Sequence, residues 1–181
     1  MGHRALVAYR RPGRLYDLRY SHWGGSDLSL PEALTAETPL ADGRVEADPL
    51  AVDVSLERVL EAFLDPCVYE ALFLVPESFA VTAYRVPWLE WADGRQRGRG
   101  AIVPVDPGAP DLRFRTWFRA TRTAMGDAVE MGVLSRDAAR SYLESRVVED
   151  EGGYVYTHTG PTRGDPEDGS LRGDPEGGSF E

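Results

Sequence analysis

Lysine and asparagine are missing from the 181-residue chain, and isoleucine and glutamine occur once each, as Ile102 and Gln96. All twenty basic residues are therefore arginine, and thirty acidic residues bring the net charge to −10. This acidic excess argues against a protein that coats nucleic acid, because such proteins are usually basic. Carboxylates hold water and cations in strong salt, where the Debye length of about 3 Å screens their mutual repulsion. The composition predicts a protein of a halophile; codon bias is the alternative explanation.

Cysteine occurs once, at Cys67, which excludes an intramolecular disulfide and a cysteine-based zinc site. The first apolar run, residues 5–9, is shorter than the core of a secretion signal. The longest apolar run, residues 71–75, is far below the roughly 20 residues that span a membrane. We therefore expect a cytoplasmic protein.

The N-terminal residues alternate in the manner of a β-hairpin, with strands over residues 3–10 and 15–22. Pro12-Gly13 lies between them as the expected turn. If these two residues form the whole loop, Tyr9 faces Tyr16 and His3 faces His22, and one face collects most of the apolar side chains.

Further along the chain, Ser55 is expected to cap a helix that ends at Asp65-Pro66, and strand-like runs follow at 68–75, 79–88 and 100–105. A second helix opens at Asp111, and Ser135 caps a third that runs to about residue 148. Residues 153–159 resemble a last strand. The pattern predicts a single α+β domain over residues 1–159, with a mainly antiparallel sheet, an N-terminal β-hairpin and about three helices packed on it.

Two segments differ from the rest of the chain. Residues 24–53 hold seven acidic residues and one arginine, and we expect an acidic surface loop or insertion there. Residues 160–181 contain a nine-residue sequence, 163–171, that is repeated at 172–180 with seven of nine positions the same. This acidic Gly/Pro-rich tail has too few apolar side chains to offset chain entropy, so we expect it to be disordered.

His3 and His22 are the candidate catalytic or metal-binding residues, because the expected hairpin places them side by side at its open end. A nearby carboxylate, for which Asp27 is the candidate, would complete a metal site or share a proton. The alternative is that both histidines bond to backbone at the sheet edge, since no HxH or HExxH spacing supports a metal. The motifs identify no cofactor.

Residues 95–122 hold seven arginines and two aspartates, a net charge of +5, so the remainder of the chain carries −15. Arg115, Arg119 and Arg122 fall at i, i+4 and i+7 of the second helix and form one stripe. Arg97 and Arg99 lie in a glycine-containing stretch that precedes a strand, whereas phosphate loops usually precede a helix. We expect the stripe to pair with the acidic 24–53 segment. The alternative is an anionic partner, either a phosphate-bearing ligand or nucleic acid; the second and third helices also resemble a helix-turn-helix.

Several segments resemble a family of uncharacterised proteins from halophilic archaea. They are residues 1–9, residues 16–24, Phe114-Arg-Thr-Trp-Phe118 and Gly132-Val-Leu-Ser135. The resemblance covers roughly residues 1 to 150 and excludes the repeated tail. It implies no activity and no catalytic residues, but it agrees with the salt-adapted composition.

No nucleophile motif, Walker sequence or dinucleotide-binding motif occurs in the chain. We therefore expect a non-catalytic binding or regulatory module. The alternative is a small enzyme with a histidine-based site at His3 and His22, with or without a metal.

Overall fold

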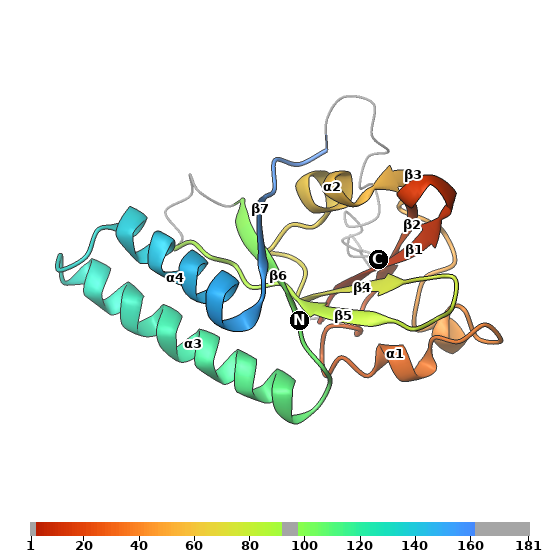
Figure 1. Ribbon diagram of the computed structural model, residues 1–181, viewed down its shortest axis with the longest axis horizontal. Coiled ribbons are helices and arrows are strands. Elements are labelled where there is room, and N and C mark those ends of the chain that lie inside the picture. The colour runs from red at the N-terminus through yellow and green to blue at the C-terminus, as the bar shows by residue number, and fades with distance from the viewer. Residues whose placement is uncertain (1–2, 92–97, 162–181) are drawn as a thin grey trace, which may run out of the picture.

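The computed structural model describes residues 3–91 and 98–161, which form a single α+β domain (Figure 1). Seven strands make one mostly antiparallel sheet in the order β3-β2-β1-β4-β5-β6-β7. The strands are β1 (Ala5–Arg11), β2 (Leu15–Ser21), β3 (Ala51–Ser55), β4 (Ala71–Val75), β5 (Thr82–Arg85), β6 (Arg99–Pro104) and β7 (Tyr154–Thr157). The helices are α1 (Leu30–Ala33), α2 (Leu56–Arg58), α3 (Ala109–Glu130) and α4 (Arg136–Glu151), and a π-helical turn, η3 (Val59–Phe63), continues α2. The predicted fold class is confirmed.

The N-terminal hairpin forms, but its register differs by one residue from the expected one. Its loop is three residues long (Pro12–Arg14), so that Arg11 pairs with Leu15 and Tyr9 pairs with Asp17. Pro12-Gly13 favours a type II turn, with Gly13 at a left-handed φ of 77°. That turn does not match the twist of a two-residue hairpin, so Arg14 joins the loop at φ 63°.

Strands β1 and β4 lie at the centre of the sheet and are its only parallel neighbours within the described residues. Residues 5–8 of β1 are completely buried, so both faces of this strand are covered. A continuous apolar run is typical of a strand buried on both faces. The expected two-residue loop placed most apolar side chains on one face of the hairpin. That expectation is wrong, because both faces of β1 are buried.

Different segments cover the two faces of the central strands, with α2 on one side and α1 on the other (Figure 1). The first face packs Leu6 and Leu72 against Val59 and Leu60 of η3, which follows a helix start capped by Ser55 as predicted. The second face packs Val7 and Phe73 against the 24–53 segment. That segment is more than a surface loop, because five of its apolar side chains are almost completely buried against this face: Leu28, Leu30, Leu34, Ala41 and Val45.

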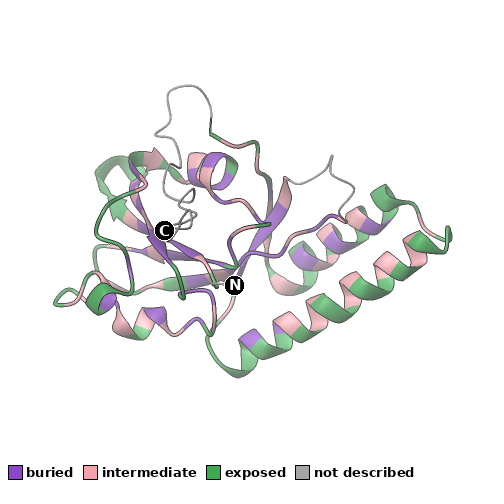
Figure 2. Ribbon diagram, turned by 180° about the vertical axis from the view of Figure 1, so that it is seen from behind, coloured by how far each residue is buried: buried purple, intermediate pink, exposed green. Residues whose placement is uncertain are grey.

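Helices α3 and α4 form a hairpin that extends beyond the β6–β7 edge, side by side in both views (Figures 1 and 2). Leu143 and Val147 of α4 and Phe114 of α3 pack on β6. Trp117 and Phe118 are partly buried against the same cluster. Much of α3 beyond this contact is exposed or half-buried (Figure 2). The two helices thus pair along their length, which is not the crossed arrangement of a helix-turn-helix.

Within residues 3–91 and 98–161, no helix is both long enough and apolar enough to cross a membrane. Most of the repeated tail, from residue 162 onward, lies outside the described residues.

Candidate functional site

Helix α3 presents the arginine stripe toward the end of β5. Arg115, Arg119 and Arg122 line a pocket of about 300 Å³, together with Arg85 at the end of β5. The remaining lining residues are Glu70, Val86, Pro87, Trp88, Phe114, Phe118 and Thr123. The predicted stripe therefore lines a pocket together with mostly apolar residues.

Arg85 is the fixed member of this group, and its side chain is only 4% exposed. Its Nε and Nη2 donate to the two carboxylate oxygens of Asp111 at 2.6 and 2.7 Å. Its other contacts are the backbone carbonyls of Gly25 and Ser26. Arg85 therefore joins β5, the start of α3 and the 24–26 loop. No motif in the sequence marks Arg85 as a site residue, although it is a charged residue inside the largely apolar 79–88 run.

The stripe takes partners other than the carboxylates of residues 24–53, so the expected internal pairing is corrected. Arg115 donates to the Ser26 carbonyl at 3.1 Å and approaches Asp111 at 3.8 Å. Arg122 donates to the Glu90 carbonyl at 2.5 Å. The exposed Arg119 has neither a hydrogen bond nor an ion pair to any described residue. The acidic segment reaches the stripe through a backbone carbonyl because its apolar side chains hold it against the sheet.

Two tryptophans hold Arg122 in place of a carboxylate. Its guanidinium carbon lies 4.7 Å from the ring centroid of Trp88 and 5.7 Å from that of Trp91, distances that suit cation–π contacts. Burial lowers the pKa of Arg122, an effect that the nearby Cys67 partly offsets. The Nε atoms of Arg115 and Arg122 and the indole N–H of Trp88 are buried without a hydrogen-bond partner. Arg122 is therefore held by aromatic rings and one backbone carbonyl instead of a carboxylate.

Glu70 brings one of the two candidate histidines to the pocket. His3 Nδ1 lies 2.9 and 3.1 Å from the two carboxylate oxygens of Glu70, a lining residue. The expected carboxylate, Asp27, instead accepts from the Ser29 N–H, the main cause of its lowered pKa. His22 Nδ1 is 2.9 Å from the Tyr20 hydroxyl.

The paired part of the hairpin ends at Ala5 and Ser21, and the His3 carbonyl then accepts from the Gly25 N–H at 2.8 Å, so His22 does not pair with His3. The Trp23 ring lies 6.3 Å from the His3 ring and 4.7 Å from the His22 ring. In the described part of the chain, no three His, Cys, Asp or Glu side chains are grouped so as to hold a metal ion.

Of the two arginines singled out before the third strand-like run, Arg97 lies outside the described residues. Arg99, the first residue of β6, donates to the Glu144 carboxylate at 2.7 Å and to the Thr157 hydroxyl at 2.8 Å. The bond to Glu144 raises the pKa of Arg99. Arg99 therefore ties β6 to α4 and β7 and is not a lining residue of the pocket.

The pocket is a positive site on an acidic protein. Its four arginines are accompanied by Glu70 and by Asp111, the partner of Arg85, which leaves a formal charge of +2. Guanidinium groups hold carboxylates and phosphates through paired N–H donors, so the available chemistry is anion binding.

The sheet, its flanking helices and this pocket define an α+β domain with an arginine-lined cavity at the junction of β5 and α3. The model of the family of unknown function DUF6735 matches residues 1–44 and 41–155. The chain belongs to this family. Comparison with the curated proteins and with the solved structures gave no match.

Proposed function

We propose that the protein is a binding module that takes a small anionic ligand into the pocket between β5 and α3. The observation that carries this proposal is Arg119, which lines the pocket beside two other arginines and has no partner among the described residues. Three neighbouring guanidiniums repel one another unless an anion lies between them. The rest of the protein is acidic, so this positive pocket would draw a small anion locally.

A small ligand fits the pocket better than nucleic acid does. A nucleic-acid surface needs a basic patch that follows several phosphates, whereas the chain outside residues 95–122 carries −15. Arg99, which would extend the patch, is occupied by Glu144. Nucleic acid therefore remains the less favoured partner, as the sequence alone also indicated.

The test is phosphate binding by Arg119→Gln, measured by calorimetry. We expect about a tenfold weaker affinity for inorganic phosphate, since hydrogen bonds to charged groups contribute about 1.5–3 kcal/mol. The free energy of unfolding should stay unchanged or rise, because Arg119 has no protein partner to lose and mutual repulsion is relieved.

Arg113→Gln is the matched control, because Arg113 lies on the same helix but donates to Glu151 at 3.0 and 2.8 Å. Its phosphate affinity should equal that of the wild type. An equal loss in both variants, or no phosphate binding by the wild type, would contradict the proposal. Copurified nucleic acid, seen as a 260/280 absorbance ratio that falls in Arg119→Gln, would favour the nucleic-acid alternative.

A histidine-dependent enzyme is the second candidate, favoured by the contact of His3 with Glu70 at the pocket. A carboxylate that orients an imidazole is a common arrangement for general acid–base chemistry. Elemental analysis of untagged protein tests a metal-dependent version. Stoichiometric metal that is lost in His3→Ala would favour the enzyme over the binding module.

We also propose that the protein works in the cytoplasm of a halophilic archaeon. The support is the composition, with thirty acidic residues, twenty arginines and no lysine. In molar salt, binding that depends on charge alone is weak, because the Debye length is only about 3 Å. A ligand bound there therefore needs contacts besides charge.

A further inference from the structure

We infer that the ligand is a phosphate monoester attached to a planar aromatic ring, an inference that rests on the anion-binding function proposed above. The pocket lining combines the stripe arginines with five apolar side chains, which together are called the apolar wall. Val86, Pro87 and Trp88 of this wall follow β5, whereas Phe114 and Phe118 lie on α3 beside the arginines. An anion without an apolar part would leave the apolar wall unused.

The charge of the pocket favours a dianion. The arginines, Glu70 and Asp111 together carry +2. A phosphate monoester carries about −1.5 to −2 at neutral pH, whereas a carboxylate carries one charge. A phosphate also offers three acceptor oxygens to Arg115, Arg119 and Arg122, whereas a single arginine satisfies a carboxylate. Thr123 adds a hydroxyl to the pocket lining.

The apolar wall favours a ring over an alkyl chain. Trp88 and Phe118 supply aromatic surfaces, and a stacked or edge-on aromatic pair adds up to about tenfold in affinity beyond the burial of its area. The volume of about 300 Å³ is at the small end of the range of ligand pockets, about 300–1,000 Å³. That size suits a single ring with its phosphate.

The test compares phenyl phosphate, inorganic phosphate and benzoate by calorimetry under one salt condition. We expect phenyl phosphate to bind about tenfold more tightly than either of the others, the upper end of the aromatic contribution. In Trp88→Leu this advantage over inorganic phosphate should shrink, and an unchanged circular dichroism spectrum shows that the variant is folded. Phe118→Leu repeats the measurement at a position that makes no cation–π contact with Arg122.

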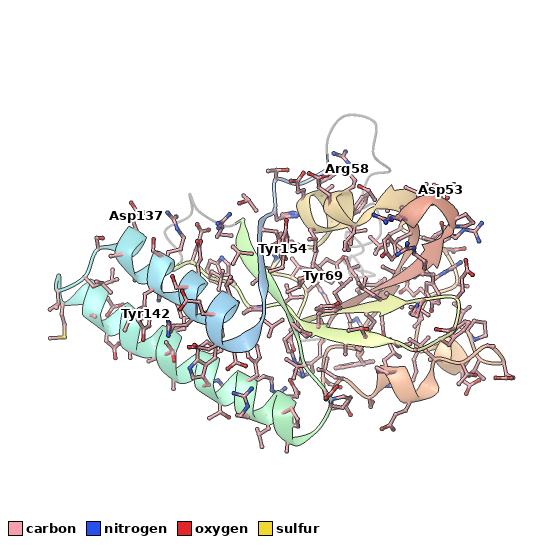
Figure 3. All side chains as sticks on the ribbon, in the orientation of Figure 1. Asp53, Arg58, Tyr69, Asp137, Tyr142 and Tyr154 are labelled. Atoms are coloured by element: carbon pink, nitrogen blue, oxygen red, sulfur yellow. The ribbon has the colours of Figure 1, made fainter. Side chains whose placement is uncertain are left out.

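Tyr154→Leu is the control, because Tyr154 is 62% exposed on β7 and is not a lining residue of the pocket (Figure 3). It should retain the full advantage of phenyl phosphate. Equal binding of phenyl phosphate and inorganic phosphate would overturn the aromatic inference and leave anion binding intact. Tighter binding of benzoate would overturn the phosphate part, and a short oligonucleotide that binds best would overturn both. If no anion binds, the proposed function fails as well.

Discussion

Gly126 is the residue at which α3 receives the indole of Trp91. A Cβ atom at this position would lie 2.9 Å from Trp91 Nε1 and 3.3 Å from Cδ1. The indole also donates to the Arg122 carbonyl at 3.3 Å and packs against the Arg122 guanidinium. A glycine in the middle of this helix, costly by helix propensity alone, thus makes room for a rigid side chain that supports the pocket.

Gly126→Ala should therefore destabilise the protein, although alanine favours a helix by about 1 kcal/mol over glycine. The indole must move to accept the methyl group, which breaks its bond to Arg122. Urea denaturation gives the stability, and the tryptophan emission maximum should shift to the red. Ala120→Gly, at an exposed position of the same helix, measures the propensity effect alone. If Gly126→Ala raises the free energy of unfolding by as much as Ala120→Gly lowers it, the close approach of Trp91 to Gly126 has no energetic consequence.

Among the elements, the junction of β5 with α3 depends on one buried ion pair. The side chains of Arg85 and Asp111 are 4% and 5% exposed, and Asp111 also satisfies part of Arg115. Breaking a buried pair leaves the remaining charge without compensation.

Arg85→Ala should lower the free energy of unfolding by about 3–5 kcal/mol. Arg146→Ala is the comparison, because its pairs with Glu149 and Asp150 are more exposed and fall within one helix; it should cost no more than about 1 kcal/mol. Urea denaturation measures both. The double variant Arg85→Met with Asp111→Leu should recover much of the loss, since it leaves no buried charge. A single-variant loss as small as that of Arg146→Ala would show that the pair does not secure the junction.

The elements that the sequence predicted correctly are those with local signals. Ser55 and Ser135 accept from the N–H groups three residues ahead, at Arg58 and Ala138, as N-caps do. The parallel pairing of β1 with β4 has no local signal, because the two strands are about sixty residues apart. The predicted hairpin register is wrong because the loop is one residue longer than expected. The same difference removes the expected pairing of His3 with His22.

The sequence predicted the arginine stripe on α3, but it did not predict the residues that surround the stripe in the pocket. The spacing of Arg115, Arg119 and Arg122 fixed their common face because helical periodicity is local. Trp88, Arg85 and Glu70 reach them only through the order of the strands. The missing pairing between the carboxylates of residues 24–53 and the stripe is equally non-local. The leucines of this segment lie in the core, and their packing keeps the carboxylates away from the stripe.

Across the whole molecule, the pocket carries +2 while the chain as a whole carries −10. The seven acidic residues of the 24–53 segment belong to a chain that carries −15 outside residues 95–122. Salt should therefore raise the stability of the protein and lower the affinity of its pocket for anions. It relieves repulsion in the acidic surface, and it weakens the attraction of the pocket for a small anion.

The midpoint of thermal unfolding should accordingly rise from low salt to molar KCl, while the affinity for inorganic phosphate falls over the same series. A variant in which Glu37, Asp42 and Asp48 become the corresponding amides tests the cause, because all three side chains are exposed. This variant should start from a higher midpoint at low salt and gain less from KCl, since fewer unscreened carboxylates repel one another. A midpoint that stays flat or falls in the wild type would mean that the acidic composition reflects codon bias and not adaptation to salt.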